Sequence, residues 1–121
     1  MKREDLRLDE LRARAEAPDF PWQPFRERVE IHRLWGDDAD GGEVAALLRY
    51  APGGMVPAHR HEAVEEIYVL RGAQRDQRGV YRAGSHVVNP AGSSHAVESP
   101  EGCLVLVIWQ KPNTWLDAGA E

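Results

Sequence analysis

Three histidines and one glutamate have the residue types and the spacing of a metal site. His59 and His61 are two residues apart, and His95 follows a turn-rich segment further along the chain. On a helix, residues i and i+2 point about 200° apart and could not share an ion. On a strand they share a face, with side chains about 7 Å apart at their roots. The spacing therefore favours a strand whose two imidazoles reach one metal at about 2.0–2.1 Å.

Glu65 has the same parity as these histidines and begins a new alternating segment. A straight strand would place it about 20 Å from the first histidine. We therefore expect the chain to bend at residues 62–64 and to carry Glu65 to the neighbouring strand. Glu66 would then face out, or orient a ligating histidine. The turn at residues 90–94 returns the chain and aims His95 at the same point.

Short apolar segments separated by turns must position these side chains. The chain has 11 glycines and 8 prolines, and turn signals recur about every 8 to 12 residues, as in a sandwich or barrel. Residues 104–109 (LVLVIW) are continuously apolar, which is typical of a strand buried on both faces. A turn is expected at Arg71-Gly72. We expect strands at 29–35, 44–50, 65–70, 85–88 and 104–109, and a polar hairpin at 73–81 that turns near 77–79.

The N-terminal segment differs from the rest of the chain. Residues 1–17 contain good helix formers, alternating charges and a thin apolar stripe. They predict a short, frayed surface helix or a mobile arm, with a docking element for a partner chain as the alternative. Residues 19–25 are expected to be extended, with Trp22 packed on the barrel. The expected division is an N-terminal arm or short helix at 1–24, a β-barrel at 25–112 and a tail at 113–121.

Composition limits the partners that the protein can have. Its 121 residues suit one domain, and its net charge of −5 argues against nucleic acid. The first 16 residues have no apolar signal region, and no run approaches the roughly 20 apolar residues of a membrane span. We therefore expect a cytoplasmic protein. The single cysteine, Cys103, excludes an intramolecular disulfide and is expected in the core.

Two glycine-bounded motifs contain the candidate ligands. The first has Gly53, His59, His61, Glu65 and Gly72, and the second has Gly84, Pro90, Gly92 and His95. In residue types and spacing the chain resembles the cupin superfamily, except that Ser99 stands where the family has Asn. The resemblance implies an all-β fold, the double-stranded β-helix or jelly-roll barrel of cupins. It also implies one divalent transition metal at His59, His61, Glu65 and His95. The two other histidines are interpreted as a strand surface residue, His32, and a pocket-lining residue, His86.

Three segments resemble the ChrR-type cupin domain in particular, a type named for an anti-sigma factor: HRHEAVEEIYVLRG, YRAGSHVVNPAGSSH and SPEGCLVLV. That factor also has an N-terminal helical domain with a His/Cys zinc site. We expect this chain to lack such a domain, because it has neither the length nor the cysteines, so sigma-factor binding is not carried over. The same branch is similar to small dioxygenases that cleave diketones and related carbonyl compounds.

Three functions are compatible with such a site. Three imidazoles and one carboxylate suit zinc, iron, manganese or nickel. The first hypothesis is a metal-dependent, dioxygenase-like enzyme that acts on small carbonyl or enol substrates, with its catalytic residues unassigned. The second is a ChrR-like regulatory or sensor cupin with zinc, and the third is a structural metal-binding dimer. We expect a small-molecule ligand or substrate, a homodimer, and no nucleic-acid or membrane partner.

Overall fold

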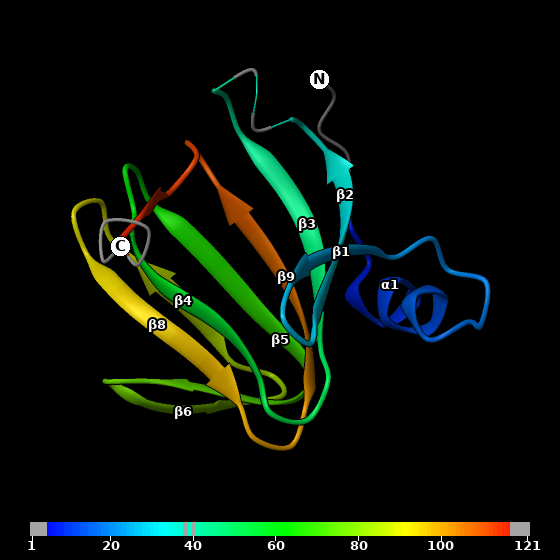
Figure 1. Cartoon of the computed structure of the whole chain (residues 1–121). Coiled ribbons are helices and arrows are strands. Elements are labelled where there is room, and N and C mark those ends of the chain that lie inside the picture. Colours follow the sequence, from blue (N-terminus) through cyan, green and yellow to red (C-terminus); the bar gives the residue numbers. More distant parts are fainter. Residues whose placement is uncertain (1–4, 38, 40, 117–121) are drawn as a thin grey trace.

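The strands form one curled antiparallel sheet whose two halves face each other (Figure 1). The computed structural model describes residues 5–37, 39 and 41–116. The hydrogen-bonded order is β1-β2-β3-β9-β5-β8-β4-β10, and β6 and β7 each pair with β5. The all-β fold expected from the sequence is confirmed. Its elements are α1 (Leu8–Ala15), β1 (Gln23–Arg26), β2 (Val29–Trp35), β3 (Val44–Tyr50), β4 (Gly54–Arg60), β5 (Glu65–Asp76), β6 (Gly79–Arg82), β7 (His86–Asn89), β8 (Ser94–Ser99), β9 (Cys103–Trp109) and β10 (Thr114–Trp115).

Alternating side chains from both halves of the sheet fill the barrel interior. The core residues of β2, β4, β8 and β9 include Ile31, Val56, Val97 and Val105, and they belong to one buried cluster. Because successive residues of a strand point to opposite faces, each of these strands contributes every second side chain to the interior. Strand β9 is buried on its outer face as well, as its apolar run predicts. Cys103 is fully buried, which confirms its core role, and burial raises its pKa to about 11.

Helix α1 covers part of the outer face of the sheet. Its acidic residues lie in the first turn and its arginines in the last, in the sense that the helix dipole favours. Leu11 and Ala15 are buried in a second apolar cluster with Leu70, Leu104 and Leu106, against which Trp22 also packs. Residues 8–15 therefore form a short helix that packs on the sheet of the same chain. Residues 1–4 lie outside the described residues. Within the described part of the chain, no helix has the length and apolar character needed to cross a membrane.

Strand β5 is longer than expected, because it belongs to both halves of the barrel. The turn predicted at Arg71-Gly72 is wrong: the strand continues to Asp76. Its pairing with β9 shifts register between Val69 and Arg71, and Gly72 has a φ of +73°. A β-bulge and a left-handed glycine thus bend the strand without ending it. Beyond the bend, β5 and β6 form the expected hairpin, with Asp76 paired to Gly79.

Two short strands near the ends of the described chain lie at the edges of the sheet. Strand β1 includes Pro24, from the segment that was expected to be extended, and an edge strand tolerates the missing N–H. Strand β10 was not expected. It pairs with β4 and places Trp115 in register with His59. The division of the chain at 24/25 and 112/113 stays a prediction.

Candidate metal centre

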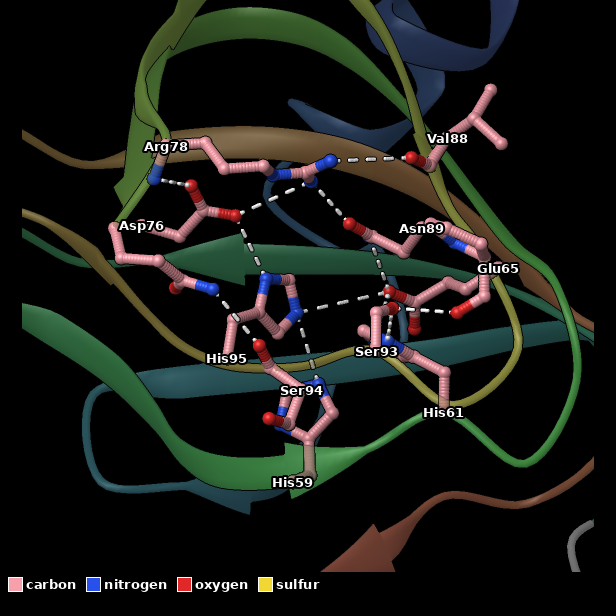
Figure 2. A network of polar contacts seen from close by, with 12 residues as sticks. His59, His61, Glu65, Asp76, Arg78, Val88, Asn89, Ser93, Ser94 and His95 are labelled. Atoms are coloured by element: carbon pink, nitrogen blue, oxygen red, sulfur yellow. Dashed lines mark hydrogen bonds and ion pairs between the residues drawn. The ribbon is translucent and has the colours of Figure 1, made fainter.

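Four buried side chains converge inside the barrel (Figure 2). They are those of His59, His61, Glu65 and His95, with relative exposures of 3%, 1%, 4% and 7%. One nitrogen or oxygen atom from each lies within 4.8 Å of the corresponding atom of every other. The structure therefore brings together all four residues that the sequence predicts as ligands.

Two of these histidines are partners across a strand pair. His59 of β4 and His95 of β8 are in antiparallel register, and their Nε2 atoms lie 3.1 Å apart. His61 follows the last residue of β4. Its backbone N–H donates to the Ser93 carbonyl and its carbonyl accepts from the Gly92 N–H, both at 2.8 Å. The turn before β8 thus clamps the backbone around His61.

Glu65 reaches the site from the other half of the barrel. It is the first residue of β5, and its Oε1 lies 3.0 Å from His61 Nε2 and 4.0 Å from His95 Nε2. The chain bends at residues 62–64 as predicted, but β5 is not the hydrogen-bonded neighbour of β4, because β8 lies between them in the sheet order. The carboxylate therefore meets the imidazoles across the barrel rather than along one surface.

A second contact fixes the orientation of each imidazole. Every ring uses Nδ1 to contact an oxygen: the Pro57 carbonyl for His59 at 2.8 Å, Ser93 Oγ for His61 at 2.9 Å, and Asp76 Oδ2 for His95 at 2.8 Å. A carbonyl and a carboxylate only accept, and the Ser93 hydroxyl already donates to the Pro90 carbonyl. All three Nδ1 atoms must then carry the proton, so each neutral ring turns the lone pair of Nε2 toward the others.

Among the residues that the structure describes, no N–H or O–H group is placed to donate to these lone pairs. Within the described part of the chain, His61 Nε2 has no hydrogen-bond partner despite its closeness to Glu65. Two unprotonated nitrogens 3.1 Å apart repel each other unless a cation lies between them. Ligand atoms that each lie about 2.1 Å from one ion are separated by about 3 to 4 Å. The separations of 3.0, 3.1 and 4.0 Å match this range, so the donor set fits a divalent transition metal.

Electrostatics keeps His59, Glu65 and His95 in the forms that bind metal. Burial lowers the pKa of both His59 and His95, so that their rings stay neutral at pH 7. Burial alone would raise the pKa of Glu65, but the neighbouring His61, His59 and His95 together outweigh it and leave that pKa lowered. Neutral imidazoles beside an ionised carboxylate are the state that a metal requires, because protonated imidazole cannot ligate.

A cavity of about 70 Å³ lies beside the site and is lined by His59, Glu65 and His95 but not by His61. The rest of its wall is largely apolar and aromatic, with polar groups from Tyr50, Gln74 and Asn113. The apolar side chains include Phe25, Ile67, Val97, Val107, Trp109 and Trp115. The centre therefore has one open side that faces an apolar chamber.

One sequence interpretation fails on the outer face of the barrel, where His86 was expected to line the pocket. Glu66 faces outward, which was one of the two expectations for it, and it orients no ligating histidine. Its carboxylate contacts His86 Nε2 at 2.7 Å, and the half-exposed His86 ring stacks on Tyr68 instead of lining the cavity. His32 lies on strand β2 as expected, half-buried against the Phe20 ring. The groups that do orient the ligands were missed, because no spacing rule singled out Asp76 or Ser93.

Comparison with known proteins agrees with the two motifs. Residues 11–112 match the family model described as the ChrR cupin-like domain. The chain belongs to this family. The resemblance inferred from the histidine motifs is thereby confirmed.

Among curated relatives of this ChrR-type cupin, the anti-sigma-E factor ChrR of Cereibacter sphaeroides is 35% identical over 75 residues. That match covers 60% of this chain and 35% of the ChrR sequence, so the chain spans about a third of that relative. In the solved complex of Rhodobacter sphaeroides SigE with the anti-sigma ChrR, a chain matches with 27% identity and a TM-score of 0.67. That match covers 80% of this chain and 57% of the other.

Two further solved structures share the fold. An RmlC-like cupin of Ralstonia eutropha has 27% identity and a TM-score of 0.71, with coverage of 82% of this chain and 68% of the other. The acetylacetone dioxygenase of Acinetobacter johnsonii matches with a TM-score of 0.76 and 15% identity. That match covers all of this chain and 83% of the dioxygenase chain. At that identity the likeness shows the cupin fold alone.

Proposed function

We propose that this ChrR-type cupin is a metal-dependent enzyme that acts on small carbonyl or enol substrates in a dioxygenase-like reaction. His59, His61, Glu65 and His95 would hold one divalent transition metal. The observation that carries the proposal is the open side of the centre, where three of these four side chains line an apolar cavity. A site whose only task was to fasten the barrel would need no chamber beside it.

The walls of the cavity favour a neutral substrate with an apolar body. Among the described residues that line it, none is Lys or Arg, so no cationic side chain is in place to pair with an anionic substituent away from the metal. Its volume of about 70 Å³ is roughly half of the 150 Å³ of an engineered cavity that holds benzene. Short acyclic molecules with two oxygens at one end therefore suit it best.

The chain itself would bind, orient and shield the substrate. When bound, a divalent metal supplies Lewis acidity toward a chelating carbonyl or enolate. Tyr50 lines the cavity, and burial raises the pKa of its phenol well above the usual 10, so its hydroxyl stays protonated and can donate to a substrate oxygen. Glu65 Oε1 accepts a hydrogen bond from Asn89, which holds the carboxylate in place at the cavity wall.

A regulatory or sensor role with zinc is the second candidate. Membership of the ChrR cupin-like domain family and the 35% identity to the anti-sigma-E factor ChrR favour it. In this case ligand capture at the metal would alter a contact with a protein partner, and a closed four-ligand zinc site would need no turnover. A purely structural metal-binding dimer stays the third hypothesis, and the homodimer and the cytoplasmic location stay predictions.

One experiment separates these candidates. The protein is purified without oxygen and its metal content is measured. Oxygen uptake is then followed with small acyclic diketones, with the bulkier phenolic ketones as a contrast in size, and with His95→Ala as a matched variant. The enzyme proposal expects turnover that needs metal and disappears in His95→Ala.

Two other results would argue against an enzyme and for a sensor. A protein with one zinc per chain and no uptake with any of these compounds contradicts the enzyme proposal. A protein partner that copurifies with this zinc form and dissociates when the metal is removed supports the sensor role instead.

A further inference from the structure

Two of the candidate ligands are each held from outside by a buried polar side chain. Asp76 Oδ2 accepts the Nδ1 proton of His95 at 2.8 Å. Asn89 Nδ2 donates to Glu65 Oε1 at 3.0 Å. Asp76 comes from the end of β5 and Asn89 from the end of β7, so these two supports belong to separate strands.

One arginine connects the two supports. The Arg78 Nη2 atom contacts Asp76 Oδ2 at 3.4 Å and donates to Asn89 Oδ1, while Nη1 donates to the Val88 carbonyl at 3.4 Å (Figure 2). The result is an unbroken path of polar contacts that runs from His95 through Asp76, Arg78 and Asn89 to Glu65. Figure 2 shows the guanidinium lying between the carboxylate and the amide.

The local backbone fixes the position of this arginine. Gln77 and Arg78 form the two-residue turn of the β5–β6 hairpin. The Arg78 backbone N–H donates to Asp76 Oδ1 at 2.8 Å, as in an Asx turn. Gln77 Nε2 donates to the Ser94 carbonyl at 2.9 Å, next to His95 in the chain. The hairpin tip is therefore clamped against β8 beside the centre.

We propose that Arg78 is a positioning residue of the metal centre, which holds His95 through Asp76 and Glu65 through Asn89. This inference rests on the metal site of the proposed function, but not on the reaction assigned to it. The guanidinium contacts no ligand itself. It turns the Asp76 carboxylate toward His95 Nδ1 and the Asn89 amide toward Glu65, so that the ligand atoms stay aimed at one point.

Charge explains why an arginine suits this place. The Asp76 side chain is 4% exposed, and a buried carboxylate needs an opposite charge. The Arg78 side chain is 41% exposed, so its guanidinium stays partly in water. Its planar group of N–H donors can contact a carboxylate, an amide oxygen and a backbone carbonyl at the same time. A lysine ammonium has no such fork and could not keep all three contacts.

The test measures metal binding rather than turnover. Cobalt(II) affinity by chelator competition and the visible spectrum of the cobalt form are compared for wild type, Arg78→Ala, Arg78→Lys and Arg75→Ala. Arg75 is the matched control, because it lies on the same hairpin but pairs with Glu98 at the surface. Removal of an outer support of a metal ligand typically weakens binding by about 10- to 100-fold.

We expect such a loss and an altered cobalt spectrum in Arg78→Ala, a smaller change in Arg78→Lys, and wild-type behaviour in Arg75→Ala. Wild-type affinity and spectrum in Arg78→Ala would overturn the proposal. If Arg78→Ala does not fold, Arg78→Lys decides the question: a wild-type cobalt affinity and spectrum in Arg78→Lys would then overturn the proposal. A wild type that binds cobalt tightly but turns over no substrate contradicts only the enzyme proposal, whereas one that binds no cobalt overturns both.

Discussion

The indole ring of Trp115 lies against the imidazole of His59, with ring centroids 5.2 Å apart and ring planes at 56°. The two residues are register partners of β10 and β4. The Arg26 guanidinium lies 3.9 Å from the centroid of the same indole, and Phe25 meets its edge. The first and last strands of the described chain thus meet at Trp115, at the wall of the cavity beside the metal ligands.

Replacing Trp115 by alanine should open the centre to solvent. The indole is only half-buried, so we expect a stability loss of about 1–2 kcal/mol and a faster transfer of bound metal to an excess of chelator. Stopped-flow measurement of that transfer tests the effect. Trp22→Ala is the matched control, because Trp22 packs with the outer cluster rather than at the cavity. Equal transfer rates in the two variants would show that Trp115 does not shield the site.

Loss of one imidazole should lower metal content. His95→Ala and His59→Ala each remove a nitrogen from the converging set, and we expect little metal in either variant by elemental analysis. Binding of metal at a hundred times its Kd stabilises a protein by about 2.7 kcal/mol, so added metal should raise the melting temperature of wild type but not of these variants. His86→Ala, which removes a half-exposed histidine of the outer face, should behave as wild type. Full occupancy in His95→Ala would remove this residue from the site.

The metal-free protein should lose stability as the pH falls below about 6.5. Burial lowers the pKa of His59 and of His95 from the usual 6.5, so in this range the unfolded chain takes up protons that the folded chain does not. Protonation then favours unfolding, and the loss continues until the pH falls below the folded-state pKa values. Urea unfolding at pH 7.5, 6.5 and 5.5 measures it.

His95→Ala, which lacks one of these groups, should show a weaker pH dependence. Metal binding should weaken over the same range, since protons compete for the imidazoles. Stability that rises on acidification, or a metal affinity that is flat from pH 8 to pH 5, would contradict the assignment.

Alanine at Gly72 should be strongly destabilising. A left-handed conformation costs an alanine about 1–2 kcal/mol, and an added Cβ would in addition lie 2.2 Å from the Gly102 carbonyl oxygen. Gly84 is the matched control: its φ of +95° is also left-handed, but a Cβ there meets nothing within 4 Å. We expect Gly84→Ala to show the conformational cost alone, and Gly72→Ala to show a larger loss in chemical denaturation. Equal losses would mean that the backbone moves freely at Gly72.

His59, His61 and Glu65 could be predicted from the sequence because strand parity is a local rule, whereas His95 was expected from the turn before it and from the second glycine-bounded motif. Two histidines at i and i+2 share a strand face, and Glu65 continues the same parity after a bend. The outer supports follow no such rule. Asp76 and Asn89 reach their ligands through a hairpin turn and a neighbouring strand, so only the pairing of β5 with β7 and β8 reveals them.

Each element that the sequence did not predict correctly has a physical explanation. Arg71-Gly72 has the composition of a turn, yet a left-handed glycine serves a bulge as well as a turn. Strand β10 has only two residues and no alternation to read, and its pairing depends on β4, more than fifty residues earlier. Pro24 lies in a strand because that strand is at the edge of the sheet.

Because of the bulge, β5 should not tolerate the loss of a single residue near Leu70. Glu65 and Asp76 are eleven positions apart, an odd number, so on an uninterrupted strand their side chains would face opposite sides. Leu70 has no partner in the pairing with β9 and packs in the second apolar cluster on the outer face. This one extra residue shifts the alternation of side chains, so that Asp76 faces the barrel interior as Glu65 does. Deletion of a single residue at that point would straighten β5 and rotate Asp76 away from His95, while leaving every candidate ligand in the sequence intact.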